Sequence, residues 1–356
     1  RLATFSPDGT KVAFVRDNNI FCVDVTSGAE KQLTTDGARN KIINGAADWV
    51  YEEEFALSRA LWWSPDSKRL AFLRFDETNV PEYSMMYYDT TLYPKVYSYK
   101  YPKAGEANSV VTLHVYTVAN NQRLQIDVGK ETDQYIPRVL WSPSGALCYL
   151  RENRLQNHIE FLEANLETGA SRLIFEEKDA CYIEEPTDSY ITFLEGGQKF
   201  IFPSERSGFR QLYLCSWDGN TPPKALTQGE NEVIEVYGYS PKTKRIYYRA
   251  YDDSPLRTAL FSMKADGSDN KKMSVGEGGV AVWFNTAMTY YIQTFSSIQT
   301  VPQITLHSID GKQVRVLEDN KALKDKLKGY QLPEKKFVCV FSDEVLNNRD
   351  FLPDRA

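Results

Sequence analysis

Short alternating segments of apolar and polar residues recur along the whole chain, and one unit of them repeats. FSPDG at residues 5–9 combines an aromatic residue with a Ser-Pro turn, and it precedes an alternating segment at residues 12–15. The unit returns, with variations, at places that begin with Trp63, Trp141, Phe193, Tyr239 and Phe284. Alternation over four to eight positions predicts β-strands rather than helices.

A second pair of strands follows most of these segments, joined by a turn that contains glycine. Asp-Gly stands at residues 218–219, 266–267 and 310–311, and Ser-Gly stands at residues 27–28. Asp-Gly between two alternating segments favours a tight hairpin, because the turn requires positive φ. Each repeat therefore predicts a small antiparallel sheet.

These repeats predict an all-β fold, namely a β-propeller of four-stranded antiparallel blades. A small sheet cannot bury both faces alone, whereas radial stacking buries them and leaves only short edges. The aromatic positions lie 58, 78, 52, 46 and 45 residues apart, and most intervals fit a blade of about 40 to 50 residues. The interval of 78 residues predicts an insertion, which we place at about residues 77–105. A long β-sandwich is the alternative, but the regular Ser-Pro recurrence argues against it.

Composition and charge narrow the possible functions. The chain has 42 Lys and Arg against 48 Asp and Glu, a net charge of −6, and no basic cluster that predicts a nucleic-acid partner. It has no apolar run of about 18 residues, so no membrane-spanning helix is predicted. The cysteines are far apart and follow no metal-ligand spacing, which predicts buried free thiols. Gly-x-Ser-x-Gly, phosphate-loop and His-Glu-x-x-His motifs are missing, so no catalytic, cofactor or metal site is predicted here.

The most unusual segment is DWVYEEEF at residues 48–55, where three glutamates stand among aromatic residues. Acidic triplets are commonly solvated surface turns. Here Trp49, Tyr51 and Phe55 can fix the backbone by packing, and the segment falls in the expected connection between two blades. Two carboxylates held together can receive one ammonium group, and each contact at about 3 Å is worth roughly 5 kcal/mol before desolvation at an effective dielectric constant near 20. The segment therefore predicts a site for a free amino terminus.

This segment and several others resemble the propeller of the dipeptidyl peptidase IV family. The matching motifs are DWVYEEE, LWWSP at residues 61–65, VPEYS at residues 80–84, YPKAGEAN at residues 101–108 and RVLEDN at residues 315–320. The likeness extends more loosely over nearly all of the chain. It implies a serine exopeptidase that releases Xaa-Pro or Xaa-Ala dipeptides, with an eight-bladed propeller covering an α/β-hydrolase domain. The lack of the mammalian disulfide cysteines points to a bacterial member.

The resemblance also implies roles within the acidic segment. Glu53 and Glu54 match the family's glutamates that bind the substrate's α-ammonium group, and Glu52, Trp49 and Tyr51 would support them. With the amine held, only the second peptide bond reaches the nucleophile, so the pair acts by positioning. The family's substrate-contacting Phe-Arg pair falls near residues 182–184, where this chain has an acidic residue, and no role is carried over. The family's substrate-binding arginine falls before residue 1.

The insertion resembles the arm through which family members dimerise. Residues 80–101 would form this arm, and its side chains are of the kinds enriched at interfaces. The arm residues are Tyr83, Met85, Met86, Tyr87, Tyr88 and Tyr93. A surface hairpin folded back on its own blade is the alternative. The resemblance implies a homodimer of the full-length protein.

The same resemblance sets the expected organisation. Residues 1–337 would form an incomplete propeller that lacks part of its first blades, and residues 338–356 would begin the linker to a hydrolase domain outside this chain. The expected partners are peptides with a free N-terminus, that hydrolase domain and a second copy, with no cofactor. The expected location is periplasmic, cell-surface or secreted, and the chain alone is expected to be inactive. A freestanding propeller scaffold that binds peptides or proteins, and a related peptidase of altered specificity, are the alternatives.

Overall fold

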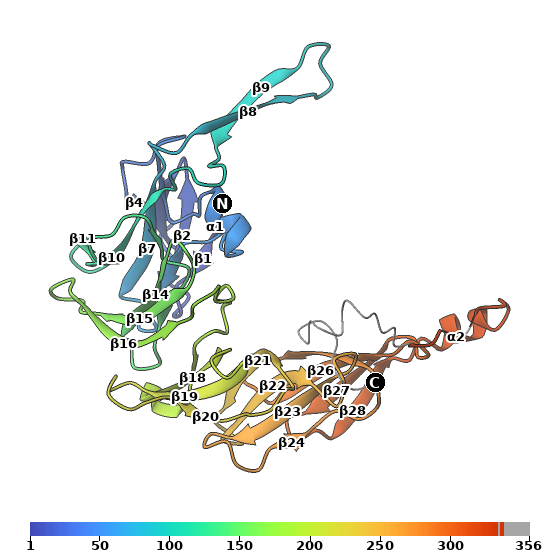
Figure 1. Ribbon diagram of the computed structural model, residues 1–356. Helices are drawn as coiled ribbons and strands as arrows, with labels where there is room; N and C mark the ends of the chain where they lie inside the picture. The colour runs from blue at the N-terminus through green and yellow to red at the C-terminus, as the bar shows by residue number, and fades with distance from the viewer. Residues whose placement is uncertain (334, 338–356) are drawn as a thin grey trace. The chain divides into compact units, whose positions relative to one another are not determined.

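The computed structural model describes residues 1–333 and 335–337, and almost all of its regular structure is β-strand (Figure 1). The expected linker at residues 338–356 therefore lies outside the described residues. Within the described residues, six antiparallel sheets of four or five strands follow one another along the chain, and a separate two-stranded sheet is inserted in the second of them. The six larger sheets are the blades of a β-propeller, which confirms the predicted fold class. Two compact units, Arg1–Asp188 and Ser189–Ala356, contain three blades each.

The first unit contains the first three blades. The first blade consists of β1 (Thr4–Phe5), β2 (Lys11–Arg16), β3 (Asn19–Asp24) and β4 (Glu30–Gln32). The second consists of β5 (Ile42–Asn44), β6 (Leu61–Trp63), β7 (Arg69–Asp76), β10 (Val110–Thr117) and β11 (Gln122–Gln125). The third consists of β12 (Gln134–Tyr135), β13 (Val139–Trp141), β14 (Leu147–Asn153), β15 (His158–Ala164) and β16 (Ser171–Lys178).

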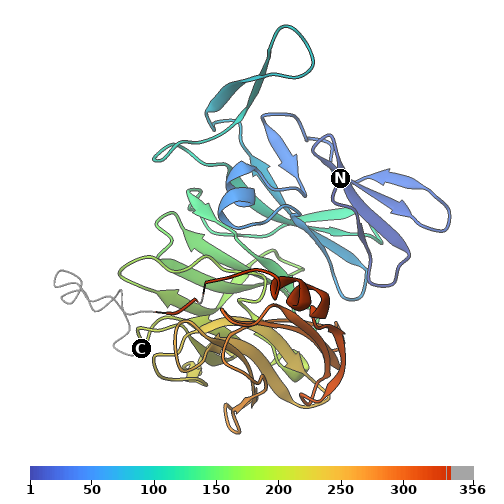
Figure 2. The same ribbon diagram turned by 90° about the vertical axis from the view of Figure 1, so that its right-hand side faces the viewer.

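The second unit contains the last three blades, and Figure 2 shows their strands from a second side. The fourth blade consists of β17 (Thr192–Phe193), β18 (Lys199–Ser204), β19 (Gln211–Ser216) and β20 (Lys224–Ala225). The fifth consists of β21 (Val233–Ser240), β22 (Arg245–Tyr251), β23 (Thr258–Lys264) and β24 (Lys271–Lys272). The sixth consists of β25 (Gly279–Phe284), β26 (Tyr290–Ser296), β27 (Gln303–Ser308) and β28 (Gln313–Glu318), and helix α2 (Lys321–Leu327) follows it.

The repeated Ser-Pro-Asp turn is closed by its own side chains. In the first blade the Ser6 hydroxyl donates to Asp8 at 2.6 Å and accepts from the backbone N–H of Lys11 at 2.9 Å. Hydrogen bonds from Ser6 and Thr10 lower the pKa of Asp8 to about 2. The second blade repeats the arrangement from Ser64. The motif is therefore a structural turn that starts the second strand of a blade.

The aromatic residues before this turn connect neighbouring blades within the first unit. The indole N–H of Trp63 donates to the backbone oxygen of Thr4 at 3.3 Å, and that of Trp141 donates to the backbone oxygen of Trp62 at 3.1 Å. Each bond links strands near the start of successive blades. Because each bond joins strands of two different blades, it favours one arrangement of adjacent blades.

We expect Trp141→Phe to lower the free energy of unfolding of the first unit by about 1 kcal/mol, because it removes the hydrogen bond between the two blades and leaves the Trp62 oxygen with only its partner within the sheet. Urea unfolding followed by circular dichroism measures the change. Trp283→Phe is the matched control, since Trp283 is 58% exposed and should change stability by under about 0.5 kcal/mol. Equal effects of the two substitutions would contradict a role for the inter-blade bond.

The predicted insertion is a two-stranded hairpin formed by β8 (Glu82–Tyr87) and β9 (Lys95–Lys100). It leaves the second blade between β7 and β10, and both views show it projecting from that blade (Figures 1 and 2). Every residue of β8 is exposed, and Tyr88 and Tyr93 near the tip are 75% and 82% exposed. The hairpin does not fold back on its own blade.

The cysteine prediction holds only in part. Cys148 and Cys215 are buried and Cys22 is half-buried, as expected for small apolar side chains, but Cys181 is exposed. Cys181 lies in the irregular segment between β16 and β17, where no sheet covers it. Cys339 lies outside the described residues.

Candidate functional site

The acidic segment forms helix α1 (Trp49–Glu54), and it lies inside the second blade rather than between two blades as the sequence predicted. Strands β5 and β6 both pair with β7, so they are two halves of one interrupted strand. The chain leaves this strand and returns to it through a bridge between Ala46 and Arg59. The interruption of this strand explains why the blade has five strands. The bridge and the two paired strands hold both ends of the segment that contains α1.

The side chain of Asp48 starts the helix. Its Oδ1 accepts from the backbone N–H of Tyr51 at 3.0 Å, and its Oδ2 accepts from the Ser109 hydroxyl at 2.6 Å. Such a cap satisfies a backbone donor that the first turn leaves free. Burial raises the pKa of Asp48. The cap therefore ties the start of α1 to the segment that enters β10.

Aromatic packing fixes the rest of α1. The Tyr51 ring lies 4.9 Å from the Phe75 ring and 5.2 Å from the Phe55 ring, and its hydroxyl accepts from the Ile136 N–H at 2.7 Å. At the other end, the guanidinium of Arg138 donates to the backbone oxygen of Phe55 at 2.8 Å. Tyr51 thus holds the helix in the core.

Trp49 and Glu52 lie on the outer side of the helix. The Trp49 ring packs 4.1 Å from Tyr101 at the base of the hairpin, so it connects α1 with the second end of the insertion. The side chain of Glu52 is exposed in the first turn, where a carboxylate is favoured by the helix dipole.

Glu53 and Glu54 lie side by side in sequence in the last turn of α1, and both are exposed. A carboxylate is disfavoured at this end of a helix, and the last turn contains no basic residue. Glu54 accepts from the side-chain amide of Gln156 at 3.0 Å. The side chain of Glu53 makes no hydrogen bond or ion pair within the part of the chain that the structure describes. Two carboxylates on a fixed backbone are therefore available to a cation.

A second group of carboxyls adjoins this pair and was missed by the sequence analysis. Glu152 of β14 is fully buried, and neither of its side-chain oxygens has a partner among the described residues. Burial, together with the nearby charges of Glu185 and Glu54, raises its pKa to about 8. The signal was a charged residue at an inward position of a strand whose residues 147–150 are all buried.

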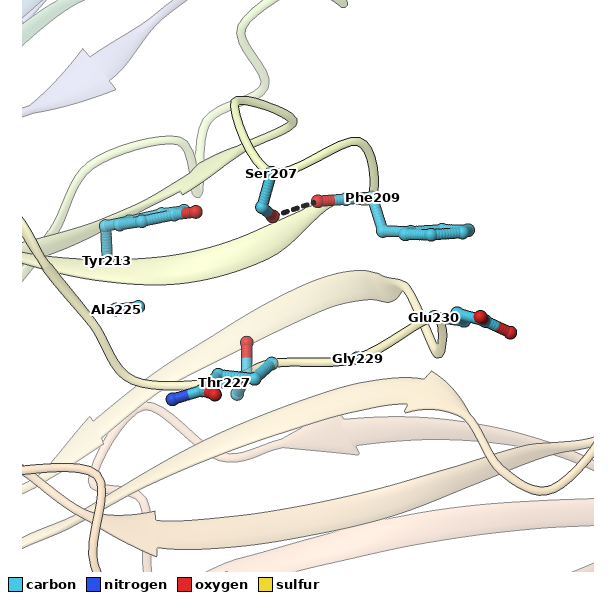
Figure 3. Close-up of a pocket in the computed structure, with 8 residues that line it drawn as sticks. Ser207, Phe209, Tyr213, Ala225, Thr227, Gly229 and Glu230 are labelled. Carbon is cyan, nitrogen blue, oxygen red and sulfur yellow. Dashed lines mark hydrogen bonds between the residues drawn. The ribbon is translucent and has the colours of Figure 1, made fainter.

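A group of three titratable side chains and a pocket are weaker candidates for a binding site. The carboxylates of Glu160 and Glu176 pair with Arg151 at 2.7 Å and Lys178 at 2.8 Å, so the neighbouring His158 has no uncompensated acidic partners for a metal. A pocket of about 460 Å³ in the fourth blade is lined by the loops around Ser207 and Gly229 (Figure 3). Figure 3 shows that the phenyl ring of Phe209 and the carboxylate of Glu230 do not converge on one point.

The chain is similar in sequence to known dipeptidyl peptidases. Residues 1–302 match the family model described as the dipeptidyl peptidase IV (DPP IV) N-terminal region. Dipeptidyl peptidase 4 of Trichophyton rubrum is 32% identical over 99% of this chain and 47% of its own length. A probable dipeptidyl-aminopeptidase B of Talaromyces marneffei is 28% identical over 97% of this chain and 42% of its own length. The chain thus spans about half the length of these relatives.

Solved structures show the same relationship. The crystal structure of Porphyromonas gingivalis dipeptidyl peptidase 4 is 38% identical with a TM-score of 0.90, and the match covers 96% of this chain and 48% of that one. A putative dipeptidyl aminopeptidase IV from Bacteroides ovatus is 26% identical with a TM-score of 0.77, and the match covers 90% and 46%. In the described part of this chain, neither helix has the length and apolar character needed to cross a membrane.

Proposed function

This chain belongs to the dipeptidyl peptidase IV N-terminal region family, and on that basis we propose that it is the substrate-recognition propeller of a serine exopeptidase. In this proposal Glu53 and Glu54 bind the α-ammonium group of a peptide, and the whole protein removes Xaa-Pro or Xaa-Ala dipeptides. The observation that carries the proposal is a pair of exposed carboxylates at the unfavourable end of a rigidly held helix. Sites where local preferences are violated without local compensation are commonly functional.

The pair contributes position rather than bond chemistry. Asp48 caps the start of α1, Tyr51 holds its middle and Arg138 binds its end, so the backbone that carries the two carboxylates stays fixed relative to the blade. A substrate amine held at a fixed point lets only one peptide bond reach a nucleophile at another fixed point. Holding reacting groups in place contributes to the rate by removing motional entropy in advance.

Binding of short peptides to the 356-residue chain tests this proposal. We expect Gly-Pro-Ala-Ala to bind measurably by calorimetry and its N-acetylated form to bind at least about tenfold more weakly, because acetylation removes the positive charge. Binding that is unaffected by acetylation would overturn the amine anchor and favour the alternative, a scaffold that recognises other features of a peptide or protein.

We also propose that the β8–β9 hairpin is an interface between two copies of the full-length protein. Its support is the apolar and aromatic character of a projecting, exposed hairpin, which is unusual for surface that stays in water.

Replacing Tyr87, Tyr88 and Tyr93 together by serine is expected to convert dimers of the full-length protein to monomers in sedimentation velocity. Leu256→Ser, at another exposed apolar residue, is the control and should leave the dimer intact. Unchanged dimers in the triple variant would refute this interface.

A further inference from the structure

The carboxyls around Glu54 outnumber the single cation that an amine anchor needs. Glu54 is exposed on α1, Glu185 is half-buried in the segment after β16, and Glu152 is fully buried on β14. Gln156 joins the two outer carboxyls, since its side chain bonds to Glu54 and its backbone oxygen bonds to Ile183, two residues before Glu185. The charges of Glu54 and Glu185 also both act on Glu152, which agrees with one cluster of three carboxyls. Tyr182 joins it, because its hydroxyl bonds to Glu185, and burial and the same three carboxyls raise its pKa.

Three arginines of the third blade and its connection form ion pairs with other carboxylates. Arg154 pairs with Asp133 at 2.9 Å, and Arg151 pairs with Glu160 at 2.7 Å. Arg138 lies 2.9 Å from Asp188. Within the described part of the chain, Glu54, Glu152 and Glu185 form no ion pair. Both oxygens of the buried Glu152 also have no hydrogen-bond donor there.

We propose that Glu185 and Glu54, above the buried Glu152, form a second cation subsite that takes the side-chain charge of a lysine or arginine as the first residue of a bound peptide. This inference rests on the proposed function, since it places the α-ammonium group at Glu53 and Glu54. The side chain of the first residue branches from the carbon that carries this ammonium group. A long basic side chain can therefore reach a neighbouring carboxylate while its amine remains anchored.

One turn positions both parts of the subsite. Gln156, at the tip of the β14–β15 hairpin, has a left-handed backbone with φ of 52°. Its side-chain amide donates to Glu54 at 3.0 Å, and its backbone oxygen accepts from the Ile183 N–H at 2.8 Å. The turn thus links the helix that presents Glu54 to the segment that presents Glu185.

Proton release from the buried Glu152 provides a second measurement, in addition to affinity, of whether a cation binds at this subsite. Its titratable neighbours are Glu54 and Tyr51 from α1, and Glu185 and Tyr182 from the segment after β16. A cation bound between Glu54 and Glu185 offsets the charges that disfavour ionised Glu152. A peptide with a basic first residue should therefore release a larger fraction of a proton at pH 7.5 than a neutral analogue does.

The test compares Lys-Pro-Ala-Ala with norleucine-Pro-Ala-Ala, which has nearly the same apolar stem without the side-chain charge. We expect the lysine peptide to bind the 356-residue chain about tenfold more tightly at low salt, with the preference shrinking as salt screens it. Calorimetry in two buffers of different ionisation enthalpy should show the additional proton release. Glu185→Gln should reduce the preference to about twofold, whereas the control Glu167→Gln, in an exposed turn, should retain it.

The outcomes separate the two proposals. If both free-amine peptides bind equally well and their acetylated forms do not bind, the amine anchor stands and the second subsite is refuted. If acetylation makes no difference, the proposed function itself fails. A lysine preference that survives Glu185→Gln would also overturn the subsite, and the unchanged affinity of the norleucine peptide for this variant would show that the variant is folded.

Discussion

Replacing Glu53 by glutamine is expected to weaken binding of free-amine peptides by about 100-fold, the largest effect we expect at the candidate site. Glutamine keeps the shape of the side chain but removes its charge. Truncating a charge-paired contact in a recognition site typically costs about 2 to 5 kcal/mol, which corresponds to between about 30-fold and several thousandfold. Calorimetry with Gly-Pro-Ala-Ala measures the change, and cleavage of a Gly-Pro substrate by the full-length protein provides a second readout.

Glu52→Gln is the comparison for this experiment, because it removes the same charge from the same helix. Glu52 directly precedes Glu53, and consecutive side chains point about 100° apart around a helix, so Glu52 faces away from the expected amine position and we expect a loss of about threefold or less. Thermal unfolding separates function from folding, since Glu53→Gln removes a carboxylate from the negative end of the helix dipole and should leave stability unchanged or slightly higher. Equal losses for Glu52→Gln and Glu53→Gln would indicate long-range charge attraction in place of a specific contact.

The fold could be predicted because its information is local and repeated. Alternating strands, Ser-Pro-Asp turns and Asp-Gly hairpins each depend on a few neighbouring residues, and the structure shows Ser6 and Ser64 making the same turn bonds. The placement of α1 could not be predicted. The sequence between β5 and β6 reads as a connection, and only the shared pairing of both strands with β7 shows that one strand is interrupted.

In the candidate site, too, some residues could be predicted from the sequence and others could not. The glutamates of α1 are contiguous in sequence, so a motif reveals them, and the helix cap at Asp48 is equally local. Glu152 and Glu185 come from a strand of the third blade and the segment that follows it. Their proximity to Glu54 depends on how two blades pack, which no pattern along the chain specifies. The acidic residue near residues 182–184 was a departure from the family in the sequence, and the structure connects this segment with Glu54 of α1 through Ile183 and Gln156.

The buried Glu152 should make the stability of the first unit depend strongly on pH. Its ordinary pKa of 4.5 is raised to about 8 in the folded chain, so the folded state binds this proton more tightly than the unfolded state does. Stability is therefore expected to fall as the pH rises from about 4.5 to about 8, and the full cost of burying the charge is present only above that range. Glutamine is neutral throughout. We expect Glu152→Gln to stabilise the first unit by about 3 to 5 kcal/mol at pH 8.5 and by under about 1 kcal/mol at pH 5.

Urea unfolding of the variant and the unmodified chain at matched pH values isolates this effect, because titration of the groups that do not interact with Glu152 cancels in the difference. Glu77→Gln is the matched control: Glu77 is also buried, but its pKa is raised only to about 7, so its benefit should be smaller and complete at a lower pH. A stability difference for Glu152→Gln that stays constant from pH 5 to 8.5 would mean that this carboxyl is ionised in the folded protein. The cluster would then hold a further full negative charge, and the larger proton release expected for a peptide with a basic first residue would disappear.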